Sequence, residues 1–262
     1  MRALHTAATG MQAQELNVQV ISNNIANMRT TGYKRQRAQF QDLLYEHVSR
    51  VGTQTSSAGN ILPVGIDLGG GVKTVGTPRL MSQGTLSQTG NDLDIAIRGE
   101  GFFKIQMPDG TYTYTRDGSF QMDAQGRVVT AQGNPVQPTI TIPQNASGLS
   151  INAQGQLSVT LPGSTTPTTV GQIGLTRFIN KAGLNPIGDN LFTDTPASGT
   201  PQDGIAATDG YGDMQQSNLE QANVEVVSEI SDLIAAQRAY EMNAKVVSAA
   251  DQMLQSTSNM FR

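Results

Sequence analysis

Apolar residues recur every seven positions at both ends of this 262-residue chain, and this spacing constrains the fold more than any other feature. Near the N-terminus, two interleaved columns lie on one side of a helix. One column is Leu4, Met11, Val18 and Ile25, and the other is Ala7, Gln14, Ile21 and Met28. All of them except Gln14 are apolar, which is a heptad pattern. We predict a helix over 1–31 that ends at Gly32, a residue suited to a left-handed cap.

A second helix is predicted over 217–261, about 45 residues or roughly 65 Å long. Its leading column repeats strictly every seven residues: Val226, Leu233, Tyr240, Val247, Leu254 and Phe261. A companion column is weaker because it includes polar residues: Ile230, Gln237, Ala244, Asp251 and Ser258. Ser217 and Glu220 have the spacing of a capping box, with Asn223 as the alternative N-cap. The strict repeat favours a supercoil with a partner helix over a straight core helix.

Two interpretations of these apolar stripes stay open. Each helix could pack on its own domain as an ordinary amphipathic helix, or the two could pair as an antiparallel coiled coil. Charge favours the antiparallel pair. The basic residues Arg29, Lys34, Arg35 and Arg37 follow the first helix, and the acidic residues Asp213, Glu220, Glu225, Glu229 and Asp232 surround the start of the second. Antiparallel pairing brings these opposite charges together, which sets orientation more than stability.

Between the two helices, the sequence predicts extended and then β structure. Residues 46–90 are rich in turn and loop residues, with Pro63 and Pro78 as helix breakers. From about 93 to 208, short strands alternate with Gly and Pro turns, as in antiparallel barrels and sandwiches. We therefore predict an α+β fold with a nested antiparallel β domain, either a barrel or a sandwich. The predicted domains are a helical coiled-coil domain of 1–45 and 212–262, an extended linker or stapling region of 46–90, and a β-rich outer domain of 91–211.

Composition excludes several classes of function. The net charge of −4 argues against a nucleic-acid-binding protein, which needs a basic surface. The chain has no Cys and only two His, His5 and His47, so thiol catalysis is excluded and a His-based triad or zinc site is not expected. No run approaches 18 apolar residues, so we expect no membrane insertion. The start of the sequence lacks the apolar core of a signal peptide, so we expect no cleaved signal.

The search for chemistry gives no site. Asp92 and Asp94 could share a strand face and act as a carboxylate pair, but no His or third carboxylate follows nearby, so we interpret them as surface residues. Residues 116–119 read as a turn rather than a nucleophile elbow. We expect no catalytic residue, no cofactor and no metal, and hence no enzyme. Assembly remains, because apolar helix faces that one chain cannot bury must be covered by partners, and copies that join head to tail build a helical filament.

Two motifs at the ends of the chain resemble a known family. Residues 20–27 (VISNNIAN) and 30–34 (TTGYK) are similar to the N-terminal signature of the bacterial flagellar rod, hook and hook-associated axial proteins. Residues 217–224 and 237–241 (QRAYE) are similar to their C-terminal signature. The motif residues are Asn23, Asn24, Asn27, Gly32, Gln237, Arg238 and Tyr240. Within the family, the segments 34–45, 46–72, 94–103, 114–120 and 136–143 resemble the distal-rod members, so the resemblance covers essentially the whole chain.

The resemblance implies a structural subunit of the flagellar distal rod, which polymerises into a rigid helical tube and transmits motor torque through the periplasm to the hook. Leu4, Met11, Val18, Ile25, Val226, Leu233, Tyr240, Val247 and Leu254 would be the assembly seam. The implied partners are other copies of the chain, the proximal rod proteins, the hook protein, the P-ring and L-ring proteins and the flagellar export apparatus. The implied location is the periplasmic part of the basal body, reached by type III export.

Other interpretations remain in view. A proximal rod protein should lack a stretch such as 46–72, and a hook protein should have a larger outer domain. A surface adhesin, a different class, is expected to have a signal peptide. A β-sandwich enzyme is expected to have a carboxylate pair with aromatic neighbours.

Overall fold

The computed structural model describes residues 2–49, 64–163, 166–208 and 210–260. The chain divides into two compact units. Unit 1 comprises Met1–Ile25, Gln36–Pro78 and Glu225–Arg262, and unit 2 comprises Ala26–Arg35 and Arg79–Val224. The chain therefore crosses between the units four times, and both units are built from segments that are distant in sequence.

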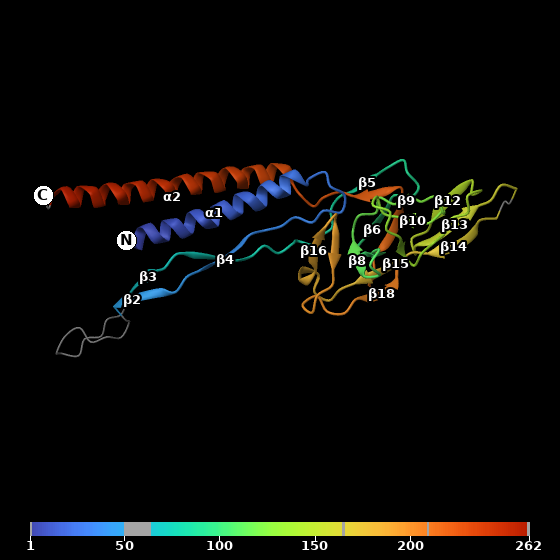
Figure 1. The fold of residues 1–262 in the computed structure, drawn as a ribbon, viewed down its shortest axis with the longest axis horizontal. Coiled ribbons are helices and arrows are strands. Elements are labelled where there is room, and N and C mark those ends of the chain that lie inside the picture. Colours follow the sequence, from blue (N-terminus) through green and yellow to red (C-terminus); the bar gives the residue numbers. More distant parts are fainter. Residues whose placement is uncertain (1, 50–63, 164–165, 209, 261–262) are drawn as a thin grey trace. The chain divides into compact units, whose positions relative to one another are not determined.

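Unit 1 contains two long helices and two pairs of strands (Figure 1). The helices are α1 (Arg2–Ala26) and α2 (Val226–Met260). The strands are β1 (Gln39–Asp42), β2 (Tyr45–Ser49), β3 (Ile66–Gly69) and β4 (Val72–Gly76). β1 pairs antiparallel with β4, and β2 pairs antiparallel with β3. These four strands are called the hairpin below. None of the helices that the structure describes has the length and apolar character needed to cross a membrane.

Both predicted helices are present, but both are shorter than predicted. α1 ends at Ala26, and Gly32 lies in the turn that follows, with a positive φ of 67°. α2 begins at Val226 rather than at 217, so the predicted capping box is wrong. Ser217 has a φ of 55° and lies between two strands, and the Asn223 side chain accepts a hydrogen bond from the Arg35 N–H group (2.7 Å) instead of capping the helix. Strand pairing in this segment overrides the local helix signal.

Unit 2 is built of short antiparallel strands and one 3₁₀ turn, η1 (Lys181–Gly183). The largest sheet has the order β11-β7-β8-β17-β16, and a second has the order β12-β13-β14. The remaining pairs in this unit are β10-β9, β15-β18, β19-β6 and β20-β5. The bounds are β5 (Leu86–Gln88), β6 (Ile95–Arg98), β7 (Phe103–Gln106), β8 (Tyr112–Thr115), β9 (Gln121–Met122), β10 (Val128–Val129), β11 (Val136–Gln137), β12 (Gly148–Ile151), β13 (Gln156–Thr160), β14 (Thr168–Gln172), β15 (Gly174–Arg177), β16 (Asn185–Gly188), β17 (Leu191–Thr193), β18 (Gln202–Ile205), β19 (Asp213–Gln216) and β20 (Asn218–Glu220).

The predicted α+β fold with antiparallel sheets is confirmed by these pairings. The predicted hairpin around Pro108-Asp109-Gly110 is also present, because β7 pairs with β8 from Phe103↔Thr115 to Gln106↔Tyr112. The last two strands of unit 2 pair with its first two, since β19 pairs with β6 and β20 pairs with β5. The strands that precede α2 are thereby integrated into the β unit.

Two apolar clusters form the core of unit 2. The larger is aliphatic and is centred on fully buried residues such as Ile95, Ile105, Leu157 and Leu175. The smaller is mainly aromatic and contains Phe102, Tyr114, Phe178, Leu184 and Phe192. Its rings meet edge to face, with 4.7 Å between the centroids of Tyr114 and Phe178. Such aromatic pairs contribute about 0.5–1.5 kcal/mol beyond the area that they bury.

Burial of Tyr114 predicts an alkaline loss of stability. Burial raises the pKa of Tyr114 to about 12 from 10.0. Above pH 10 the unfolded chain releases this proton while the folded chain keeps it, so stability is lost as the pH rises from 10 towards 12. The loss should reach at most about 1.4 kcal/mol per pH unit. Urea titrations at pH 9 and pH 11 measure it, and Tyr114→Phe, which keeps the ring, should lose less over that interval. An equal loss in both proteins would contradict the assignment.

Candidate assembly surfaces

The two helices of unit 1 lie side by side and run antiparallel (Figure 1). Asn24 of α1 donates a hydrogen bond to Glu229 of α2, with 3.1 Å between Nδ2 and Oε2. Further along, a Cβ atom on Gly10 of α1 would lie 2.9 Å from Nδ2 of Asn243 on α2. The two α1 residues are separated by as many positions as the two α2 residues, in the opposite order. This register defines an antiparallel pair in close contact at Gly10.

The buried side of α1 overlaps the predicted columns only in part. Ala7 and Ile21 are buried, and Leu4, Met11, Val18 and Ile25 are half-buried. The remaining buried positions of α1 are Ala13, Val20 and Asn24. Gly10 lets α2 approach closely, because a side chain there would meet Asn243. Which of these positions meets another copy of the chain stays a prediction.

The buried side of α2 differs from the predicted companion column. Its buried residues are Glu229, Ala236 and Ala250, spaced by multiples of seven. In the leading column, Leu233 and Val247 are half-buried, whereas Val226, Tyr240 and Leu254 are exposed. Phe261 lies outside the described residues. The inner face of α2 therefore combines Leu233 and Val247 of the leading column with residues one position before the predicted companions.

A second apolar surface on α2 is exposed, and the sequence analysis did not find it. We call it the outer stripe. It consists of Val227, Ile230 and Ile234, with Val227 76% and Ile234 46% exposed. At about 100° per residue these positions lie on the side of α2 away from Glu229, Ala236 and Ala250. The 3-4 spacing of Val227, Ile230 and Ile234 in the sequence indicates this surface. The stricter seven-residue repeat of the leading column is the stronger pattern, and the predicted apolar face was based on it.

α2 also extends past the start of α1. In the register given by Asn24 and Gly10, Arg2 lies opposite Asp251, so about nine residues, 252–260, have no α1 residue opposite them. They span roughly 13 Å at 1.5 Å per residue, and every one of them is exposed. This segment includes Met253, Leu254 and Met260 of the exposed apolar residues. We call 252–260 the overhang.

The hairpin packs against α1 within unit 1. The N–H group of Val72 donates to Oγ1 of Thr9 (3.4 Å), and Arg2 forms an exposed ion pair with Glu46 (2.7 Å). Gly71 has a φ of 115°, and a side chain there would collide with Thr9, so glycine is required. The outward residues of the hairpin are apolar to an unusual degree. Leu44 is 93% exposed, and Tyr45, Val48, Ile66, Leu68 and Val75 are exposed as well.

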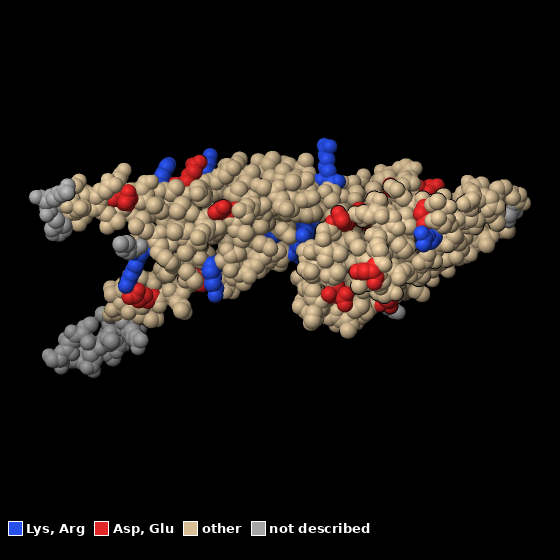
Figure 2. Space-filling view, in the orientation of Figure 1, with Lys and Arg blue, Asp and Glu red and all other residues tan. Residues whose placement is uncertain are grey.

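Charge is sparse on the surface. The sequence has 17 Lys and Arg and 21 Asp and Glu among 262 residues. Figure 2 shows them scattered over the visible face with uncharged surface between them. Such a surface can be buried against a partner with little loss of charge solvation, because interface cores are depleted of charged residues.

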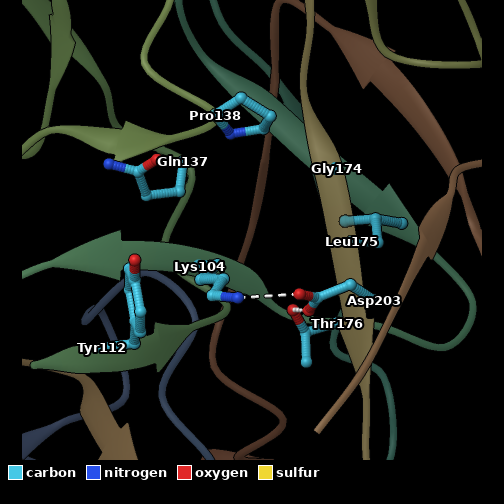
Figure 3. Close-up of a pocket in the computed structure, with 8 residues that line it drawn as sticks. All are labelled: Lys104, Tyr112, Gln137, Pro138, Gly174, Leu175, Thr176 and Asp203. Carbon is cyan, nitrogen blue, oxygen red and sulfur yellow. Dashed lines mark hydrogen bonds and ion pairs between the residues drawn. The ribbon is translucent and has the colours of Figure 1, made fainter.

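Unit 2 has a hollow lined by residues of β7, β8, β11, β15 and β18 (Figure 3). It has a volume of about 220 Å³ and is lined by Lys104, Tyr112, Gln137, Pro138, Gly174, Leu175, Thr176 and Asp203. Nζ of Lys104 lies 2.7 Å from Oδ2 of Asp203 and 4.5 Å from the centroid of the Tyr112 ring. Burial raises the pKa of Asp203, but the hydrogen bonds from Lys104 and Thr176 outweigh it and lower the pKa overall. The charged groups of the hollow, Lys104 and Asp203, are thus paired with each other, and Asp203 also accepts a hydrogen bond from Thr176.

The other candidate groups for chemistry do not converge. Asp94 is buried and accepts a hydrogen bond from Asn91 (3.0 Å), whereas Asp92 is exposed, and both precede β6 rather than sharing a strand face. In the part of the chain that the structure describes, His, Asp and Glu form no group of three that could hold a metal ion.

Comparison with known proteins assigns the chain to a family. The model of the "Flagella basal body rod protein" family matches residues 4–34, that of the "Flagellar hook protein FlgE/F/G D1 domain" matches 96–159, and that of the "Flagellar basal body rod FlgEFG protein C-terminal" matches 215–260. A flagellar basal-body rod protein FlgG of Caulobacter vibrioides is 54% identical over 99% of both chains. The FlgG proteins of Agrobacterium fabrum and Bacillus subtilis are 48% and 34% identical over 100% of both chains. The chain belongs to the flagellar basal-body rod protein family. The resemblance to axial proteins of the distal-rod type is thereby confirmed.

In this rod protein, the N-terminal motif residues have structural roles within the single chain. The side chain of Asn24 is buried and pairs with the backbone of Gln36, donating to its carbonyl oxygen and accepting from its N–H group (both 2.9 Å). The Asn24 side chain thus makes the two backbone hydrogen bonds that a neighbouring strand would otherwise make with Gln36. The side-chain amide of Asn24 also donates to Glu229. Asn27 accepts a hydrogen bond from Thr30 Oγ1 (3.2 Å), and Asn23 lies exposed on α1.

The remaining motif residues are Gly32 and the three residues of the C-terminal motif. A Cβ atom on Gly32 would lie 2.7 Å from the backbone nitrogen of Asp117, so the positive φ and the close approach both require glycine. Gln237, Arg238 and Tyr240 are exposed on α2 of the rod protein. The structure therefore places Asn24, Asn27 and Gly32 of the N-terminal motif at folding contacts and leaves Asn23 and the C-terminal motif on the surface.

Asn24 gives a test of the helix pair in the rod protein. Asn24→Asp removes two donated hydrogen bonds and places a carboxylate beside buried Glu229. We expect the free energy of unfolding of the helical part to fall by about 2–4 kcal/mol. Far-UV circular dichroism during a urea titration measures it. The control Gln12→Asp, at an exposed position of α1, should change the stability by less than about 0.5 kcal/mol. Equal effects of the two substitutions would show that Asn24 does not hold the pair.

Proposed function

We propose that this rod protein polymerises into the distal rod through its helices and hairpin, forming a rigid helical tube that transmits motor torque through the periplasm to the hook. The observation that carries the proposal is the outer stripe together with the overhang. The outer stripe is an apolar surface that the rest of the described chain leaves exposed, and the overhang exposes Met253, Leu254 and Met260 among six polar residues. Contiguous apolar surface on a protein of this kind marks an interaction site, and a head-to-tail contact between copies produces a filament.

The finer parts of the predicted fold belong to this proposal. In the tube, α1 and α2 form an antiparallel coiled coil, and each α2 packs between its own α1 and a neighbouring copy. The terminal helical domain is 1–45 and 212–262, and the β-rich outer domain of 91–211 is a barrel or sandwich. Leu4, Met11, Val18, Ile25, Leu233 and Val247 hold the pair together, while Val226, Tyr240 and Leu254 remain available to a neighbour because they are exposed.

The stapling role assigned to 46–90 is supported by the hairpin. The described residues leave five outward apolar side chains of the hairpin exposed: Leu44, Tyr45, Val48, Ile66 and Leu68. A neighbouring copy covers them, and the contact keeps the tube straight. The stretch 50–63, which falls within this role, lies outside the described residues.

The remaining roles follow from the place of a rod in the flagellum. The partners are other copies, the proximal rod and hook proteins, the P-ring and L-ring proteins and the export apparatus, which delivers the chain to the periplasm. The protein has no catalytic activity in this proposal. A proximal rod or hook protein is the alternative, and it is disfavoured because rod proteins named FlgG match along the full length.

A charge on the outer stripe tests polymerisation. Ile234→Asp should leave the monomer folded because Ile234 is 46% exposed, but it buries an unpaired charge at every contact of the tube, at a cost of several kcal/mol each. Electron microscopy should show monomers where the parent forms tubes. The matched control Ile234→Leu keeps an apolar side chain and should assemble. Leu233→Asp is a less clean test, since Leu233 is half-buried in the single chain. Tubes formed by Ile234→Asp as readily as by the parent would refute the role of the stripe.

A further inference from the structure

Three charged side chains from distant parts of the sequence meet inside unit 2. The side chains of Lys34 and Glu220 are 1% and 0% exposed, and Nζ of Lys34 lies 2.6 Å from Oε1 of Glu220. Arg116 is 4% exposed, and its Nη1 atom lies 3.5 Å from Oε2 of the same carboxylate. Two buried cations therefore share one buried carboxylate. Buried charges without a partner are costly, so Glu220 is the group on which the balance depends.

Each member of this cluster comes from a different segment. Lys34 follows α1, Arg116 follows β8, and Glu220 is the last residue of β20. Arg116 connects the cluster to the core strand β6, since its guanidinium donates to the carbonyl oxygens of Ile97 (3.4 Å) and Gly99 (2.6 Å). The carboxylate of Glu220 also accepts a hydrogen bond from the N–H group of Gly84 (2.8 Å). The cluster thus ties both entry segments to the β unit.

The pKa shifts of Lys34 and Arg116 are consistent with two buried cations facing one carboxylate. Burial lowers the pKa of Lys34 and of Arg116, although attraction to Glu220 opposes the shift in both. Glu100 adds a weaker favourable charge from the surface, where it also pairs with Lys181. Nε of Arg116 has no hydrogen-bond partner among the described residues. Without Glu220, the two cations would keep neutral acceptors: the carbonyl oxygen of Ser82 for Lys34 (2.9 Å) and those of Ile97 and Gly99 for Arg116. Glu220 supplies the buried negative charge that balances them.

We infer that Glu220 is a closing charge, which allows unit 2 to adopt its final fold only after the segment before α2 has joined the segments that carry Lys34 and Arg116. A chain is synthesised from its N-terminus, so Lys34 and Arg116 are present long before Glu220. Until then, closing the β unit would bury two cations with no carboxylate between them. The device couples completion of the β unit to the arrival of the C-terminal part of the chain.

The inference predicts an asymmetry between the partners, measured in the full chain by hydrogen exchange of the β6 amides. Glu220→Gln leaves two buried cations, so the protection of β6 should fall by about a hundredfold or more. Lys34→Met leaves one cation with one carboxylate, so protection should fall by less than about fivefold. The double variant has one cation fewer than Glu220→Gln and should recover at least about tenfold of the lost protection.

A matched control breaks an exposed ion pair of the same unit. Asp203→Asn removes the charge opposite Lys104, where the carboxylate side chain is 57% exposed, and should change the protection of β6 by less than about threefold. If Glu220→Gln does not fold, recovery of the fold in the double variant supports the closing charge, and failure of both overturns it. Equal losses in Glu220→Gln and Lys34→Met, or no loss in either, would also overturn it.

Discussion

α2 is apolar on two sides, and a single chain has only one α1 to cover it. One side, with Ala236 and Ala250, faces α1, while the outer stripe is left exposed. The overhang adds residues beyond the reach of α1. Because burial of apolar surface stabilises by about 25 cal/mol per Å², this arrangement favours contact with a further copy. The proposed polymerisation rests on this mismatch between the two helices in length and in apolar surface.

Unit 2 is held by contacts between segments from opposite ends of the sequence. The N–H group of Gly32 donates to the carbonyl oxygen of Glu220 (2.8 Å), and Lys34 pairs with its side chain. Asn223 bonds the backbone of Arg35 and of Leu80. Amide side chains, which can donate and accept together, replace strand neighbours where the chain enters and leaves the unit. The β unit therefore depends on residues well outside its own strands.

The sequence predicted the long-period features well. Both helices, the antiparallel strands and the 108–110 hairpin follow from periodicity and turn residues. The columns of α1 match its buried side only at Ala7 and Ile21. The predicted start of α2 was wrong because long-range pairing decides the structure there: residues 218–220 pair with β5, so the local capping signal was misleading. The buried set Lys34, Arg116 and Glu220 could not be predicted as a cluster, because only the fold brings the three together. Opposite charge runs at the two ends were the available signal.

Thiol accessibility tests the central claim most directly, because the chain has no cysteine of its own. Ile234→Cys places one thiol on the outer stripe, and Ala236→Cys places one on the buried side of α2. Labelling with a maleimide should be fast at position 234 in the monomer and slow in the assembled tube, while position 236 should react slowly in both. Equally fast labelling of position 234 in monomer and tube would contradict the account, because the outer stripe would then not be covered by a neighbouring copy.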